Sequence, residues 1–130
     1  MSEGNILIVD DDPDITEAMK LVLEDAGYTI QAGRDSDAAM RLIRESKPDL
    51  IILDVIMNTP QEGFSLSRQL KKNPEYKGIR ILMLTSVKEK TGIDFKSAAG
   101  DEEWLPVDAF LDKPVRPDVL LEQVKALLAR

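Results

Sequence analysis

Short apolar runs that end in polar residues recur along the chain and predict the strands of a β-sheet. The clearest is residues 50–53, four consecutive apolar residues followed directly by Asp54. A run that is apolar at every position is typical of a central strand in a parallel sheet, because helices cover both faces of such a sheet. Residues 6–9 form another run that is apolar throughout, and further strands are predicted at residues 28–32, 79–84 and 109–111.

Between these runs, apolar residues recur at the three- and four-residue spacing of amphipathic helices. The first predicted helix has its apolar positions at Ile15, Met19, Val22, Leu23 and Ala26. Pro13 suits the first turn of this helix, Asp12 is a plausible N-cap, and Gly27 supplies the stop. Both ends of the helix are therefore predicted from local signals.

Three further long helices follow the same logic. Asp35 or Ser36 can cap the second helix, Gly63 opens the third, and Pro117 starts the last one. A short helix is expected at residues 93–99. Five strand-then-helix units predict an α/β fold with a doubly wound five-stranded parallel sheet, in the flavodoxin-like order 2-1-3-4-5 with helices on both faces. Residues 1–130 are expected to form one domain.

Composition excludes several classes of function. The 130 residues include 17 Lys and Arg against 24 Asp and Glu, and this net charge of −7 disfavours direct nucleic-acid binding. The chain has no cysteine and no histidine, so disulfides, Ser–His triads and thiolate or imidazole metal sites are excluded. No apolar run approaches the ~20 residues that span a bilayer, and the start lacks a signal pattern. We therefore expect no membrane insertion and a cytoplasmic location.

Polar groups that complement one another follow the predicted strands. Asp10 and Asp11 follow the first strand, Asp54 the third, Thr85 the fourth and Lys113 the last. In a 2-1-3-4-5 sheet these strand ends converge on one crevice. Clustered carboxylates repel one another unless a cation lies among them, and oxygen-only ligands suit Mg²⁺. A metal, a lysine and a nucleophilic carboxylate are the components of phosphoryl transfer.

Four stretches of the chain resemble the receiver domains of two-component response regulators. They are residues 8–12 (Ile-Val-Asp-Asp-Asp), 53–54 (Leu-Asp), 84–86 (Leu-Thr-Ser) and 110–114 (Phe-Leu-Asp-Lys-Pro). Each stretch is weak alone, but all four occur in the family's order and span essentially the whole chain. The resemblance implies a stand-alone receiver, since the predicted last helix runs to the end of the sequence.

The resemblance also implies a role for each site residue. Asp54 would accept a phosphoryl group from a sensor histidine kinase. Asp11 would bind Mg²⁺ directly and Asp10 through water, with Asp54 and the backbone carbonyl of Ile56 as further ligands. Lys113 would contact the phosphoryl oxygens.

Thr85 and Phe110 would move together when the phosphoryl group is added. This coupled movement would be a switch between two states, and the added charge would favour one of them. The resemblance implies that this switch alters protein–protein contacts. The expected partners are the sensor kinase and a histidine phosphotransfer protein or another downstream protein, and a phosphorylation-dependent homodimer is a further candidate. In this interpretation the chain is not an enzyme, because it catalyses only its own phosphorylation and dephosphorylation.

Plainer interpretations and two other functions stay open. Read singly, Asp54 is a turn residue, Lys113 a surface residue and Phe110 a core residue. A receiver-like docking module could signal without phosphorylation, since a fold alone does not determine function. A Mg²⁺-dependent aspartyl-phosphate phosphatase is less consistent with the sequence, because Ile56 stands where such enzymes need a second acid. Turnover of a phosphate ester would indicate the phosphatase, and stoichiometric labelling would indicate the receiver. No labelling would indicate the docking module.

Two departures from the family pattern affect the partners and the lifetime of the phosphorylated form. The loop at residues 56–63 is about one residue longer than usual, and the interval from Thr85 to Lys113, which holds the extended Gly92 to Pro106 region, is several residues longer. Partner choice therefore cannot be carried over from relatives. Ile56 and Val87 occupy positions that tune phosphoryl lifetime in the family, and neither side chain can hydrogen-bond an attacking water. We expect the phosphorylated form to decay slowly.

Overall fold

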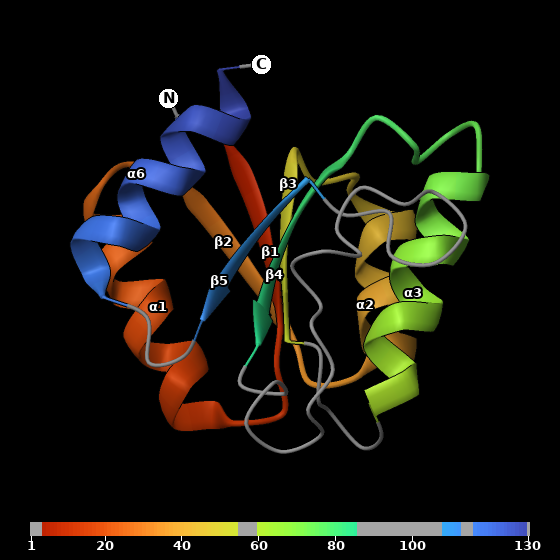
Figure 1. Ribbon diagram of the computed structural model, residues 1–130, viewed down its shortest axis with the longest axis horizontal. Coiled ribbons are helices and arrows are strands. Elements are labelled where there is room, and N and C mark those ends of the chain that lie inside the picture. The colour runs from red at the N-terminus through yellow and green to blue at the C-terminus, as the bar shows by residue number, and fades with distance from the viewer. Residues whose placement is uncertain (1–3, 55–59, 86–107, 113–115, 130) are drawn as a thin grey trace.

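A parallel β-sheet with helices on both faces forms the protein (Figure 1). The computed structural model describes residues 4–54, 60–85, 108–112 and 116–129. The strands are β1 (Asn5–Val9), β2 (Thr29–Gly33), β3 (Leu50–Asp54), β4 (Arg80–Thr85) and β5 (Ala109–Asp112), in the order β2-β1-β3-β4-β5. The described helices are α1 (Pro13–Asp25), α2 (Ser36–Glu45), α3 (Pro60–Lys72) and α6 (Pro117–Leu128). The predicted doubly wound parallel architecture is confirmed, with strand boundaries shifted by at most about one residue.

Two apolar cores lie on the two faces of the sheet. Figure 1 shows α1 and α6 on one face and α2 and α3 on the other. Every residue of β3 is buried, as the continuous apolar run predicts. Because side chains alternate along a strand, Ile51 and Leu53 pack with α2 and α3, whereas Leu50 and Ile52 pack with α1 and α6. The central strand is thus enclosed, and its polar terminal residue is held in a fixed position.

Local capping decides where the helices at the sheet edge begin. The Asp12 side chain accepts hydrogen bonds from the backbone N–H groups of Asp14 (2.9 Å) and Ile15 (3.4 Å), so the predicted N-cap of α1 is confirmed. For α2, Asp35 rather than Ser36 is the cap, since its carboxylate accepts from the N–H of Ala38 at 2.8 Å. Each carboxylate satisfies a backbone donor that the helix leaves unpaired.

The predicted end of α1 is confirmed, but the predicted start of α3 is wrong. Gly27 follows the C-cap of α1 with φ of 103°, a conformation that glycine adopts without a steric cost. α3 begins at Pro60 rather than at Gly63. Proline favours the first helical turn, because its ring fixes φ and its missing N–H is not needed there. The short helix predicted at residues 93–99 lies outside the described residues.

A partly buried ion pair joins the amino ends of β4 and β5 to the end of α3. The ammonium of Lys71 lies 3.2 Å from Asp108 Oδ2 and donates to the carbonyl of Ile79 at 2.9 Å. The same carboxylate oxygen accepts from the N–H of Ile81 at 2.7 Å. Both side chains are about one-fifth exposed, at 20% and 23%. We refer to Lys71 and Asp108 as the amino-end clamp.

Candidate metal centre

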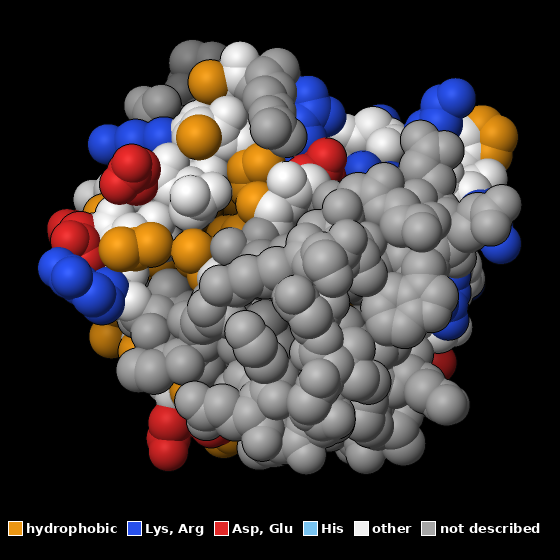
Figure 2. All heavy atoms as spheres, viewed as in Figure 1, with side chains coloured by type: hydrophobic (Ala, Val, Ile, Leu, Met, Phe, Trp, Pro, Cys, Tyr) orange, Lys and Arg blue, Asp and Glu red, His pale blue; other side chains and the backbone are white. Residues whose placement is uncertain are grey.

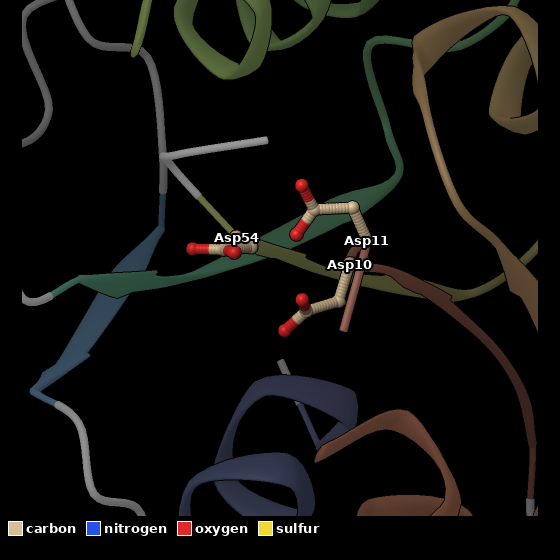
Figure 3. A group of neighbouring side chains, drawn as sticks. All are labelled: Asp10, Asp11 and Asp54. Carbon is tan, nitrogen blue, oxygen red and sulfur yellow. The ribbon is translucent and has the colours of Figure 1, made fainter. Parts of the chain in front are cut away.

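Three carboxylates meet where β1 and β3 end. β1 and β3 are neighbours, with Val9 opposite Leu53, so the residues that follow this pair lie side by side. One carboxylate oxygen from each of Asp10, Asp11 and Asp54 lies within 4.8 Å of the other two. Figure 3 shows all three carboxylates turned toward a common space. The sequence predicted this meeting from the convergence of parallel strand ends.

The position of Asp10 is held from both sides. Its backbone N–H donates to the carbonyl of Gly33 at 3.1 Å, which extends the β1–β2 pairing by one residue. Its Oδ1 atom accepts from the N–H of Asp12 at 2.9 Å. Asp10 is only 3% exposed. The turn that leads into α1 therefore fixes one oxygen of this carboxylate and leaves the group directed toward Asp54.

The other two carboxylates differ in exposure. Asp54 ends the buried strand β3 and is 5% exposed, whereas Asp11 is exposed. The cluster is thus buried on the side of the sheet and open to solvent at Asp11. Asp12 does not belong to the cluster, because its side chain caps α1.

The ligand set suits a hard divalent cation. Three carboxylates in close proximity destabilise one another by like-charge repulsion, and a cation among them removes this cost. Ligand oxygens around an octahedral Mg²⁺ lie roughly 3–4 Å apart, given Mg–O distances of about 2.1 Å. The 4.8 Å limit on the carboxylate oxygens lies close to that range, so small side-chain adjustments would let them share one ion. The cluster could hold a metal ion, and its all-oxygen chemistry fits magnesium.

The remaining predicted site residues are described only in part. Leu84 pairs with Asp54 across β3 and β4, so the backbone of Thr85 lies one residue beyond the end of β3. In β5, Phe110 is in register with Met83. For Thr85 and Phe110 the description is limited to the backbone. Ile56 and Lys113 lie outside the described residues, and their predicted roles stay predictions.

A groove beside the carboxylates contains residues that the sequence analysis did not identify. It encloses about 500 Å³ and includes Asp10, Asp11, Arg34 and Arg41 among its lining residues. Gly33 also lines the groove, and α2 packs tightly against β2 at this point, since a Cβ on Gly33 would lie 3.2 Å from the backbone nitrogen of Ala39. The one available sequence signal was that Arg34 directly follows β2, whose end lies at the same edge of the sheet. Arg41 has no comparable signal.

Two further observations concern surface charge and helix length. On the described part of the face in Figure 2, Lys and Arg side chains are scattered rather than gathered into one basic patch. Among the residues that the structure describes, no helix is both long enough and apolar enough to cross a membrane.

Comparison with known proteins identifies one family. Residues 6–125 match the response regulator receiver domain. Protein PilH of Pseudomonas aeruginosa is 32% identical over 128 residues, which cover 97% of this chain and 98% of PilH. The DNA-binding dual master transcriptional regulator RpaA of Synechocystis is 34% identical over 125 residues, which cover 96% of this chain and 49% of RpaA. This chain thus spans about half the length of RpaA and of several other curated relatives that it matches.

The fold is shared with solved receiver structures. The signal receiver domain of a signal transduction histidine kinase from Syntrophus aciditrophicus superposes with a TM-score of 0.81 at 35% identity. The match covers 97% of this chain and 90% of that one.

Proposed function

Because the chain belongs to the response regulator receiver domain family of two-component signalling, we propose that it accepts a phosphoryl group on Asp54 from a sensor histidine kinase. The observation that carries the proposal is the cluster of Asp10, Asp11 and Asp54 at the carboxyl ends of β1 and β3. The family resemblance assigns these same three residues to the phosphorylation site.

Each carboxylate has a distinct task in this proposal. Asp11 would hold Mg²⁺ directly and Asp10 would hold it through water, with Asp54 and the carbonyl of Ile56 as further ligands. When bound, Mg²⁺ neutralises negative charge on the phosphoryl oxygens. A carboxylate oxygen of Asp54 attacks phosphorus, the phosphorus–nitrogen bond to the kinase histidine breaks, and its electron pair stays on the imidazole. Asp54 is 5% exposed at the end of a fully buried strand, which limits the directions from which a phosphodonor can reach its carboxylate.

In this proposal, residues in or directly after β4 and β5 respond to phosphorylation. Lys113 pairs with the phosphoryl oxygens, Thr85 hydrogen-bonds the group, and Phe110 changes position with Thr85. The changed surface alters binding to a histidine phosphotransfer protein or another downstream protein. The chain catalyses only its own phosphorylation and dephosphorylation.

Intact mass spectrometry after incubation with a small phosphodonor, acetyl phosphate, tests the proposal. We expect one added phosphoryl group per chain that requires Mg²⁺ and is absent from Asp54→Asn. Asp49→Asn is the matched control, because Asp49 directly precedes the same strand, at its opposite end, and is exposed. Absence of the adduct together with absence of Mg²⁺ binding would favour a docking module that signals without phosphorylation. Continuous turnover of the donor without a stable adduct would favour a phosphatase.

The lifetime of the phosphorylated form is a separate prediction. Ile56 and Val87 offer no hydrogen bond to an attacking water, so we expect slow loss of the phosphoryl group. Ile56→Asn supplies such a group and should accelerate the loss, measured as the decay of the phosphorylated mass after the donor is removed. An unchanged decay rate would show that the side chain at this position does not control the lifetime.

A further inference from the structure

The two edges of the sheet differ in how they are protected against pairing with another strand. β2 and β5 are the edge strands (Figure 1). Natural edge strands are usually blocked by charges, proline, bulges or short length. β5 has four residues, ends in Asp112 and follows Asp108. β2 has five residues, none of them charged or proline, and none has positive φ.

The outer edge of β2 is open to solvent. Thr29, Gln31 and Ala32 are exposed, whereas the Ile30 side chain packs into the core. Thr29 donates its N–H to the carbonyl of Gly4 at 2.9 Å, and the Gly33 carbonyl accepts from Asp10, so these residues direct their backbone groups toward β1. Alternate residues of a strand direct these groups to opposite sides. The N–H and C=O groups of Ile30 and Ala32 therefore point away from β1, toward the open edge of the sheet.

We propose that β2 pairs antiparallel with β2 of a second copy of this chain, with the twofold axis at Gln31. In this register Ile30 of one copy lies opposite Ala32 of the other, and both such pairs exchange two N–H···O bonds. The outward groups of both strands are thereby satisfied, and the two sheets become one continuous sheet. Such a self-complementary contact is the usual geometry of a homodimer.

Charge complementarity favours a second copy over an unrelated extended segment. In the same register Arg34 of one copy lies opposite Tyr28 of the other. The exposed Glu24 and Asp25 at the end of α1 stand just before Tyr28 in the chain. Among the described residues, no recorded ion pair uses Arg34, Glu24 or Asp25. The twofold axis brings Arg34 toward this acidic end of α1 at both ends of the paired strands, so opposite charges approach each other twice.

Sedimentation equilibrium of the unphosphorylated chain tests the interface. We expect the average mass to rise toward twice the monomer mass as the concentration increases. Gln31→Lys places two like charges opposite each other at the axis and should weaken the dimer about tenfold or more. Gln69→Lys is the matched control, because Gln69 is exposed on α3 and the chemical change is identical. This control should associate like the wild type.

Two further measurements report on the pairing itself. Ala32→Pro removes an outward N–H without removing a β1–β2 hydrogen bond, and edge strands accept proline at such positions. This variant should remain monomeric, and if it does not fold, Gln31→Lys decides alone. Hydrogen exchange of the Ile30 and Ala32 amides should slow as the concentration rises. A wild type that stays monomeric at sub-millimolar concentration, or a Gln31→Lys variant that associates like the wild type, would overturn the proposal.

Discussion

The two ends of the central sheet use aspartate in opposite ways. At the carboxyl end, the carboxylates of Asp10, Asp11 and Asp54 face one another within 4.8 Å. At the amino end, the amino-end clamp sets the Asp108 carboxylate against the Lys71 ammonium at 3.2 Å and against a backbone N–H at 2.7 Å. One end concentrates like charge and the other neutralises it.

This difference implies that the aspartate at the amino end contributes to folding stability, whereas the aspartates at the carboxyl end contribute to cation binding. A partly buried carboxylate with a cation and an amide donor lowers the free energy of the folded state, and its removal leaves those groups unsatisfied. Crowded carboxylates raise the free energy of the folded state until a cation binds, so part of the binding energy is the relief of repulsion. The contacts at the amino end therefore stabilise the sheet, and this stability offsets the electrostatic repulsion among the three carboxylates at the carboxyl end.

The largest effect is expected from breaking the amino-end clamp. Asp108→Ala removes the acceptor for both Lys71 and the N–H of Ile81, and should lower the free energy of unfolding by about 1–3 kcal/mol. Asp108→Asn keeps an acceptor oxygen for Ile81 and should cost less. Urea denaturation of the three proteins measures both. Equal losses of unfolding free energy in the two variants would show that the hydrogen bond from the Ile81 N–H to residue 108 contributes nothing to stability.

Addition of Mg²⁺ should stabilise the carboxyl end. At a free Mg²⁺ concentration tenfold above the dissociation constant, binding to the folded state alone adds about 1.4 kcal/mol. The increase should appear as a higher unfolding temperature for the wild type and should be reduced or absent for Asp11→Ala. If Mg²⁺ raised the unfolding temperature of Asp11→Ala as much as that of the wild type, the ion would bind at a site that does not include Asp11.

Removal of one crowded carboxylate should have the opposite sign from removal of Asp108. In the absence of metal, Asp11→Ala relieves repulsion and should raise the free energy of unfolding by about 0.5 kcal/mol, a small effect because Asp11 is exposed and screened by solvent. Urea denaturation in the presence of a chelator measures this. A loss of stability would contradict the crowding argument.

The smallest effect is expected at an exposed ion pair. Arg116 and Asp118 lie 3.0 Å apart, but their side chains are 76% and 67% exposed. Asp118→Ala should change the free energy of unfolding by about 0.3 kcal/mol or less. The contrast with Asp108→Ala, measured under the same conditions, tests whether burial and not proximity makes the amino-end clamp stabilising.

Local patterns were sufficient to predict much of the fold. The continuous apolar run at residues 50–53 predicted the buried central strand, and Asp12 predicted the start of α1, because both signals act over a few residues. Asp35 and Ser36 are equally good caps by residue type, so only the structure decides between them. The start of α3 was misplaced because Gly63 directly precedes the first apolar residue, Phe64, whereas the proline signal at Pro60 stands earlier.

Contacts between distant segments could not be predicted in the same way. The meeting of Asp10, Asp11 and Asp54 followed from one general rule, that parallel strand ends converge. No rule of this kind pairs Lys71 with Asp108, which lie 37 positions apart. The groove residue Arg41 likewise depends on how α2 packs against β2. The roles of Thr85, Lys113, Ile56 and Phe110 stay predictions from family resemblance.

The most direct test of the central claim is to locate the phosphoryl group on the chain. The wild type is treated with acetyl phosphate and Mg²⁺, the acyl phosphate is trapped by borohydride reduction, and the modified residue is identified by peptide mass spectrometry. We predict modification at Asp54 alone, and only when Mg²⁺ is present. Modification at Asp10, Asp11 or a hydroxyl group instead, or equal labelling in the presence of a chelator, would contradict the account.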